Sequence, residues 1–295
     1  MEGITLFCKS YRNDLTRTKE LTESVRRFNN DSLPFYISVP ENDLGLFRNH
    51  IGTGDIEWLR DQDIIGSNRN ISHDAYGSLP GRLSQQIVKA DFWRVNPLPS
   101  YLCIDSDSIF IRAFRRSDFM ASGTIPYTLM HEGKSFHEFC LRNGLEKDME
   151  QFEIMKSKFR DIFNRQGPSY NFGPLPATWH RSVWQDLEKN YLIPREMTIV
   201  DAITFLPSEA FWYGEALVKY RSIDIVPREP FFKAYLFLEE YEHDRRIGVT
   251  HSILSKLYCG IVYQSNWHPK RLELTKNYAY HFKKTFKKFL TGFCL

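Results

Sequence analysis

The residues best suited to chemistry are two aspartates that follow an apolar run. Asp105 and Asp107 come directly after Tyr101-Leu-Cys-Ile104, and apolar residues resume at once. Unpaired carboxylates are costly to bury, so two of them beside a buried strand indicate a bound cation or a catalytic task. In an extended chain their side chains would share a face, and two hard oxygen ligands suit Mg²⁺ or Mn²⁺. The alternative is an Asp-rich turn without a chemical role.

The elements around this motif predict a parallel α/β sheet. Apolar runs at 4–8, 33–40 and 56–60 with 63–65 are expected strands, and residues 15–28 and 42–51 have helical spacing between them. This alternation favours parallel strands joined by right-handed crossovers, with ligands beyond the carboxyl ends of the strands. Asp105 lies at such an end.

The later elements are mostly helical. A helix over 82–94 comes just before the Asp105 strand, and 135–164 is expected to be helical with a break near Gly144. Residues 198–206 fit a helix or a strand, and short strands are expected late in the chain. Amphipathic spacing also predicts helices at 179–191 and 208–220.

Composition excludes several classes of protein. The 295 residues include 42% hydrophobic and 25% charged residues, as in ordinary globular proteins. A net charge of +3 gives no basic field for nucleic acid. Five scattered cysteines without a Cys-x-x-Cys pair disfavour a zinc site or a disulfide framework. Without a signal peptide or an apolar stretch of about 20 residues, the expected location is the cytoplasm.

Three segments, taken in order, resemble glycosyltransferases of the GT-A fold that use nucleotide sugars. They are Gln85-Gln86-Ile-Val-Lys89, the strand into Asp105-Ser106-Asp107, and Ser208-Glu209-Ala-Phe-Trp-Tyr213-Gly214. More narrowly, the set resembles bacterial enzymes that make surface polysaccharides of the capsule or O-antigen type, over residues 1–225. The resemblance implies a Rossmann-type α/β sandwich with a central mixed sheet. It also implies one domain over 1–275, with a nucleotide-sugar-binding half (1–115) and an acceptor-binding half (116–275).

The resemblance further implies a metal-dependent transfer from a nucleotide diphosphate sugar, with a UDP-sugar favoured. The acceptor would be a glycan or a polyprenyl-linked glycan. Asp107 is the surest ligand for Mn²⁺ or Mg²⁺, and Asp105 is a ligand or a ribose contact. A late histidine often completes such a site, and the candidates are His251 and His268, although a lone histidine is more often structural. The residues expected at the nucleotide sugar are Ser10, Tyr11, Arg12, Gln85, Gln86, Lys89, Asp105 and Ser106.

Glu209 is the candidate base on the acceptor side, with Asp201 as the second choice. An inverting transfer needs a carboxylate within hydrogen-bond reach of the acceptor hydroxyl. The structural alternative for Glu209 is a first-turn helix residue that interacts favourably with the helix dipole. For Gln85, Gln86 and Lys89 the alternative is a solvated helix face.

The last twenty residues, 276–295, form a basic aromatic tail. Aromatic and leucine side chains follow helical spacing, and four lysines at 283–288 occupy the rest. Such an amphipathic helical tail suits an anionic membrane surface, which would add peripheral attachment at the inner face of the membrane. The alternative is a terminal helix packed on the protein's own core.

Two other functions remain open. A non-catalytic carbohydrate-binding or membrane scaffold protein would tolerate Asp107→Ala. A phosphatase of the haloacid-dehalogenase type also places Asp-x-Asp after an apolar strand, with Asp105 as nucleophile. That motif normally opens the domain, whereas about one hundred residues precede it here.

Overall fold

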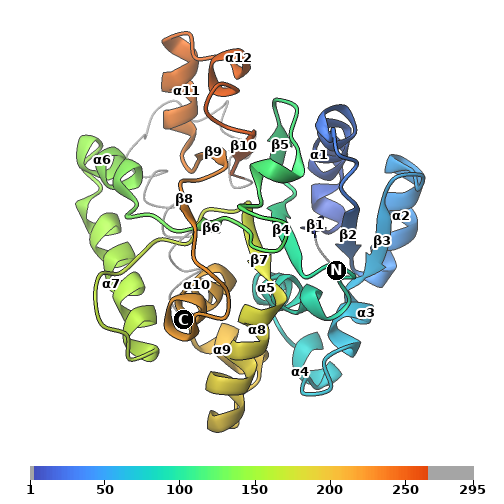
Figure 1. The fold of residues 1–295 in the computed structure, drawn as a ribbon. Helices are drawn as coiled ribbons and strands as arrows, with labels where there is room; N and C mark the ends of the chain where they lie inside the picture. Colours follow the sequence, from blue (N-terminus) through green and yellow to red (C-terminus); the bar gives the residue numbers. More distant parts are fainter. Residues whose placement is uncertain (1–2, 265–295) are drawn as a thin grey trace.

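The computed structural model describes residues 3–264, whose main sheet has the strand order β3-β2-β1-β4-β7 (Figure 1). Strands β1, β2, β3 and β4 run parallel, whereas β7 pairs with β4 antiparallel. The predicted Rossmann-type α/β sandwich with a central mixed sheet is therefore confirmed. The strands are β1 Ile4–Lys9, β2 Phe35–Val39, β3 Glu57–Arg60, β4 Ser100–Asp105 and β7 Ala177–His180.

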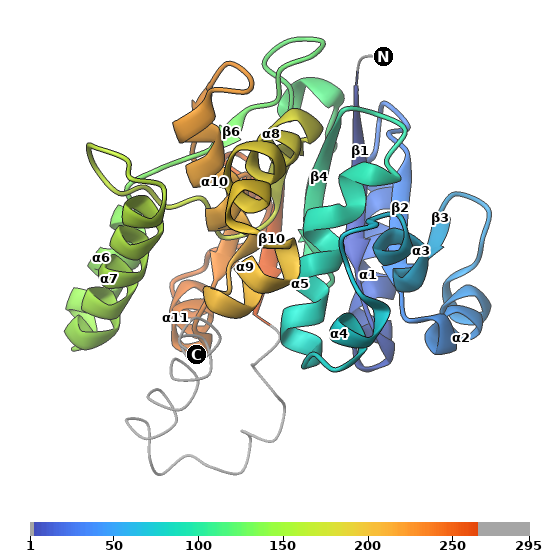
Figure 2. The same cartoon turned by 90° about the horizontal axis from the view of Figure 1, so that it is seen from below.

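Both faces of this sheet are buried under helices, which explains the nearly continuous apolar runs in the sequence (Figure 2). Successive side chains of a strand point to opposite faces. In β4, Tyr101 and Cys103 belong to one apolar cluster, and Leu102 and Ile104 belong to the other. Helices α1 and α2 cover one face, while α3, α5, α8 and α10 cover the other.

Three helices of the first half lie close to the predicted positions, namely α1 Leu15–Phe28, α2 Glu41–Ile51 and α5 Gly81–Asp91. Two short helices, α3 Asp61–Gly66 and α4 His73–Gly77, were not predicted. The predicted strand at 63–65 is wrong, because these residues belong to α3. Asp63 accepts a hydrogen bond from the Arg60 backbone N–H, and this capping interaction starts a helix directly after β3.

The second half adds a three-stranded sheet of order β5-β10-β9 and a β6-β8 pair. The break near Gly144 is confirmed, since α6 ends at Arg142 and α7 begins at Glu146. The strands are β5 Ser108–Phe110, β6 Thr128–Leu129, β8 Pro227–Arg228, β9 Phe232–Tyr235 and β10 Gly260–Tyr263. The helices are α6 Lys134–Arg142, α7 Glu146–Ile162, α8 Arg181–Leu187, α9 Ile199–Phe205, α10 Glu209–Tyr220, α11 Leu238–Arg246 and α12 His251–Leu254.

The predicted tail at 276–295 lies outside the described residues. Within residues 3–264, none of the helices has the length and apolar character needed to cross a membrane.

Candidate functional site

The candidate site lies at the carboxyl edge of the parallel strands, where the sequence placed it. Strands β1 and β4 end side by side, with Lys9 paired to Asp105 in the register. Strand β3, which is separated from β1 by β2, ends at Arg60 and is followed by Asp61. This edge therefore gathers charged side chains from strands that are distant in the sequence.

Three predicted residues from different elements meet in one buried ion cluster. The ammonium of Lys89 lies 2.5 Å from Asp105 Oδ1 and 3.2 Å from Glu209 Oε1. The Lys89 side chain is only 5% exposed and that of Glu209 10%, whereas that of Asp105 is 37% exposed. Lys89 thus joins a carboxylate open to the surface to a buried one.

The alternative of a solvated helix face is wrong for Lys89, because the helix that carries it packs on the sheet. Leu83 and Ile87 of α5 are buried in the core. The hydroxyl of Tyr101 on β4 donates to the Lys89 carbonyl at 2.9 Å, which fixes α5 against the strand that ends at Asp105.

Glu209 owes its position to the start of α10. Ser208 caps this helix by accepting a hydrogen bond from the Phe211 backbone N–H. The Tyr213 hydroxyl accepts the backbone N–H of His180 on β7 at 2.8 Å. A Cβ at Gly214 would lie 2.1 Å from the Phe172 ring. The tyrosine and glycine of this segment therefore seat α10, while Glu209 projects to Lys89.

The charges in the cluster favour a protonated lysine. Burial by itself lowers the pKa of the Lys89 ammonium, but the negative charges of Asp105 and Glu209 outweigh it and raise the pKa well above its usual value. Lys89 therefore carries a fixed positive charge between two carboxylates.

Asp105 and Asp107 are separated by a turn, so the assumption of an extended chain across the pair is wrong. Asp105 is the last residue of β4, and Ser106 and Asp107 form the turn into β5. The Ser106 hydroxyl donates to Asp14 Oδ2 at 3.2 Å, and the Tyr263 backbone N–H donates to the Asp107 carbonyl at 2.9 Å. The turn is thus held by β10 on one side and by the segment after β1 on the other.

The donor set at this turn fits a divalent cation that is shared with a substrate. Within residues 3–264, no three or more His, Cys, Asp or Glu side chains are grouped as a metal site. Mg²⁺ typically binds through one or two carboxylates together with substrate phosphates. The three carboxylates of Asp105, Asp107 and Glu209 carry three negative charges, and Lys89 carries one positive charge. The group therefore has two negative charges in excess. Asp105 and Asp107 would hold such a cation.

The histidine candidates do not complete a site in the described part of the chain. His251 begins α12, is exposed and hydrogen-bonds through Nε2 to the Tyr263 hydroxyl at 2.9 Å. It forms no ligand group with Asp105 and Asp107. His268 lies outside the described residues.

The predicted nucleotide-binding residues after β1 lie at the same edge of the sheet. Ser10 is buried and its hydroxyl is 2.6 Å from that of Thr18, whereas Tyr11 is exposed. The Arg12 backbone N–H and guanidinium both bind the buried Asp43 carboxylate, at 2.9 and 2.8 Å. Tyr11 and Arg12 are therefore surface groups that follow the end of β1, and Ser10 fixes the local chain.

The remaining predicted residues, Gln85, Gln86 and Asp201, differ in their burial and in their hydrogen-bond partners. Gln86 is buried, and its Nε2 donates to the Arg82 carbonyl at 3.3 Å, while its Oε1 has no hydrogen-bond partner among the described residues. Gln85 is half-buried. Asp201 is exposed and accepts hydrogen bonds at 2.7 Å from the backbone N–H and the hydroxyl of Thr198. That interaction caps α9, so Asp201 serves a helix start rather than the Lys89 cluster.

Sequence reasoning missed a second buried ion pair at this edge. The Lys9 ammonium lies 2.9 Å from Asp61 Oδ2, and the Ser38 hydroxyl donates to the same carboxylate. Burial raises the pKa of Asp61, and Lys9 and Ser38 only partly oppose the effect. A lysine at the end of an otherwise apolar strand was the available indication of this pair.

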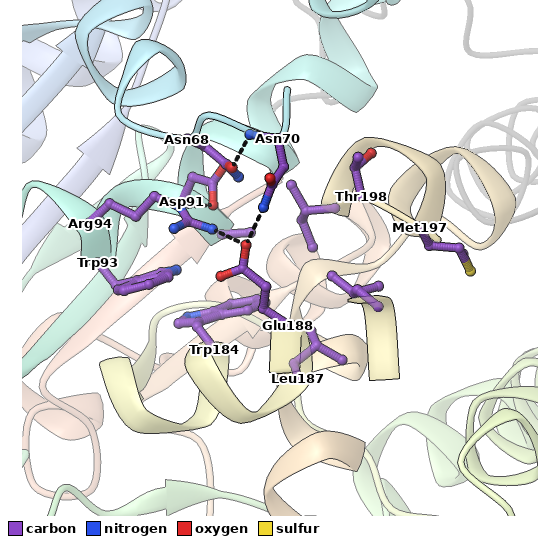
Figure 3. Close-up of a pocket in the computed structure, with 13 residues that line it drawn as sticks. Asn68, Asn70, Asp91, Trp93, Arg94, Trp184, Leu187, Glu188, Met197 and Thr198 are labelled. Atoms are coloured by element: carbon purple, nitrogen blue, oxygen red, sulfur yellow. Dashed lines mark hydrogen bonds and ion pairs between the residues drawn. The ribbon is translucent and has the colours of Figure 1, made fainter. Parts of the chain in front are cut away.

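A separate pocket lies between the end of α5 and helices α8 and α9, and contains none of the predicted site residues (Figure 3). Its polar side chains bind one another. Asn68 donates to Asp91 at 2.8 Å, and Arg94 and Asn70 donate to Glu188 at 2.8 and 3.0 Å. These bonds join helices across the pocket, which indicates a structural role.

Comparisons with known proteins give one family match and two structural similarities. The sequence model of DUF6492, a family of unknown function, matches residues 3–192. The structure is similar to mouse xyloside xylosyltransferase 1 in its apo form, at 8% identity and a TM-score of 0.45, covering 89% of this chain and 98% of that chain. It is also similar to the galactosyltransferase LgtC in complex with donor and acceptor sugar analogs, at 11% identity and a TM-score of 0.44, covering 96% and 95%. No curated protein matches the sequence.

Proposed function

The chain belongs to this family of unknown function, DUF6492, and from its site we propose that it is a glycosyltransferase that uses a nucleotide diphosphate sugar. The observation that carries the proposal is the Lys89 bridge between Asp105 and Glu209 at the carboxyl edge of the sheet. In open α/β sheets this edge is where nucleotides bind. A cation-binding carboxylate and a second, buried carboxylate are thereby set on either side of one fixed positive charge.

The proposed reaction exchanges one C–O bond for another. The bond between the sugar C1 and the diphosphate oxygen breaks, and a bond forms between C1 and the acceptor oxygen. The acceptor proton passes to the Glu209 carboxylate, and the nucleoside diphosphate leaves with the bonding electrons. Lys89 and the N-terminus of α10 place positive charge beside Glu209.

We assign Asp107 and Asp105 as the residues that hold Mn²⁺ or Mg²⁺. When bound, the cation offsets the negative charge that develops on the leaving diphosphate. Lys89 keeps Asp105 Oδ1 in place, so the carboxylate needs little reorganisation when the donor arrives. Tyr11 and Arg12 are proposed contacts of the nucleotide base and ribose.

The finer assignments follow from the sequence. We propose a UDP-sugar donor, and a glycan or polyprenyl-linked acceptor in the synthesis of a bacterial surface polysaccharide. The chain is proposed to act as one domain over residues 1–275. The basic tail at 276–295 would keep the enzyme at the inner face of the membrane, where a polyprenyl-linked acceptor is found.

The test is a comparison of matched carboxylate variants. A thermal-shift screen of nucleotide sugars, with and without Mn²⁺, first identifies the donor, because a ligand that binds only the folded state raises its stability. Asp107→Asn should then remove the Mn²⁺-dependent release of nucleoside diphosphate and leave the melting temperature unchanged. Asp74→Asn, at an exposed position of α4, is the control and should keep full activity.

The Glu209→Gln variant tests whether Glu209 acts as the base or only as a counter-ion of Lys89. If Glu209 is the base, Glu209→Gln should lose turnover, while the donor should still raise the melting temperature of the variant. Full turnover in Asp107→Asn would overturn the proposed enzyme, and full turnover in Glu209→Gln would overturn only the assignment of the base.

A further inference from the structure

The segment from the end of α11 to the turn after α12 is unusually exposed for its apolar content. Ile247 is 63% exposed, Ile253 48% and Leu257 78%. Leu254, between two of them, is buried with Tyr235 and Ile261 in a small apolar cluster that Val249 also contacts. The segment therefore packs on β9 and β10, and its exposed apolar side chains belong to an ordered part of the chain.

The same segment is basic. Arg245, Arg246 and Lys256 are exposed, and residues 245–258 contain no Asp or Glu. On α11, which leads into this segment, Glu242 is exposed, whereas two other acidic residues are paired. Glu240 lies 2.6 Å from the Lys233 ammonium, and Asp244 accepts a hydrogen bond from the Tyr235 hydroxyl at 2.8 Å. The helices α11 and α12, which bear or closely flank these cations and apolar residues, lie together at one end of the molecule (Figure 1).

We infer that residues 245–258 form a docking surface for an anionic lipid bilayer. Apolar side chains that enter the interface between headgroups and acyl chains, flanked by cations, are the pattern of peripheral membrane binding. Each lysine or arginine near an anionic surface favours binding further. A binding surface of this kind also accounts for apolar groups that a freely soluble surface would not need.

Charge argues against the protein's own tail as the occupant. The tail carries four lysines at 283–288, so it repels a surface that already carries Arg245, Arg246 and Lys256. A second copy of the segment would meet the same repulsion. An anionic bilayer is complementary to the segment and to the tail alike.

Docking at this segment would turn the candidate site toward the bilayer. Tyr263, at the end of β10, hydrogen-bonds through its hydroxyl to His251 at the start of α12 and through its backbone N–H to Asp107. The docking segment and the Asp107 turn are therefore joined through one strand. This orientation suits a lipid-linked acceptor and rests on the proposed function, whereas the docking itself does not.

The test is co-sedimentation of the full chain, without substrates, with vesicles of equal parts phosphatidylcholine and phosphatidylglycerol. Arg245→Gln, Arg246→Gln and Lys256→Gln together should lower the partition coefficient by on the order of a hundredfold, since each charge contributes about 1 kcal/mol. Ile247→Ser with Leu257→Ser should also weaken binding. Vesicles of phosphatidylcholine alone should bind the wild type weakly.

Matched controls make the outcome decisive. Arg48→Gln, Lys147→Gln and Lys158→Gln remove three exposed cations from α2 and α7, and Phe205→Ser removes an exposed apolar group from α9. These variants should bind vesicles nearly as wild type does. Equal losses in both triple variants would show a general charge effect, and unchanged binding in the 245–258 variants would show that the tail alone attaches the protein. Either result overturns the docking surface, as does a concentration-dependent dimer that the Ile247 and Leu257 changes abolish.

Discussion

Replacement of Lys89 by methionine tests the central cluster most directly. The change keeps the length of the side chain but leaves Glu209, which is 7% exposed, without its positive neighbour. Removal of one partner from a buried ion pair costs about 3–5 kcal/mol. The Asp105 side chain is 37% exposed and reaches water, so it adds little to this cost. We therefore expect a loss of about 3 kcal/mol, near the lower end of that range.

The matched control is Lys156→Met. Lys156 is as deeply buried as Lys89, but its carboxylate partner Glu153, at 2.7 Å, is 41% exposed. Glu153 is partly exposed and keeps His137 as a partner at 2.6 Å after the change, so the expected loss is about 1 kcal/mol. Urea denaturation followed by tryptophan fluorescence measures both values. Equal losses for the two variants would contradict the idea that Glu209 is held as a buried charge by Lys89.

The pH dependence of Lys89→Met gives an independent check. In the wild type the pKa of Lys89 is raised, so its contribution to stability is fully present below the unfolded pKa of about 10.4 and is lost as pH rises through the folded pKa. Lys89 therefore adds no pH dependence to the free energy of unfolding between pH 5 and 8. The Lys89→Met variant lacks this contribution, so its stability deficit should be constant between pH 5 and 8 and should shrink as pH rises above about 10.4. Glu209→Gln in the same background should restore part of the loss. A deficit that does not shrink at alkaline pH would refute the reasoning.

Three further outcomes are expected. Gly214→Ala should destabilise the protein by about 1–3 kcal/mol in urea denaturation, because the new Cβ meets the Phe172 ring at 2.1 Å, whereas Gly45→Ala in α2 has open space and should not destabilise it. Tyr213→Phe should cost about 1–3 kcal/mol in the same assay, because a buried backbone N–H of β7 loses its acceptor. Replacement of the four lysines at 283–288 by glutamine should lower binding to anionic vesicles, and unchanged co-sedimentation would rule out the tail as a membrane contact.

The sequence predicted the first half of the fold well because its pattern there is local. Helix α1 begins and ends at the predicted residues, and the strands that lead to Asp105 read as apolar runs since both faces of the sheet are covered. The strand β7 was missed for a physical reason. Ala177–His180 is four residues long and joins the sheet antiparallel to β4, a pairing that depends on contacts about 75 residues apart rather than on local periodicity.

The candidate site was only partly predictable. A lysine on an amphipathic helix gives no indication that it is buried, and the contact of Lys89 with Glu209 joins residues 120 positions apart. The turn at Ser106 and Asp107 was one of two open alternatives, because Asp-Ser-Asp fits both an extended strand and a turn. The capping role of Asp201 was readable from Thr198, three residues earlier, as a capping box.

The arrangement of charge in the cluster distinguishes the open functions. Lys89 lies 2.5 Å from Asp105 Oδ1, so a phosphatase that uses Asp105 as nucleophile would have to attack phosphorus with Oδ2. In that class of phosphatase the motif normally opens the domain, whereas Asp105 ends the fourth strand of this chain. A carbohydrate-binding module has no need for a buried ammonium that joins two carboxylates, since desolvation of such ions costs more than neutral hydrogen-bonding groups would. Transfer of a sugar from a diphosphate needs fixed charge at this position, because negative charge moves onto the leaving group as the bond breaks. The presence of this costly cluster at the carboxyl edge of the sheet is therefore the strongest physical argument for the proposed transferase.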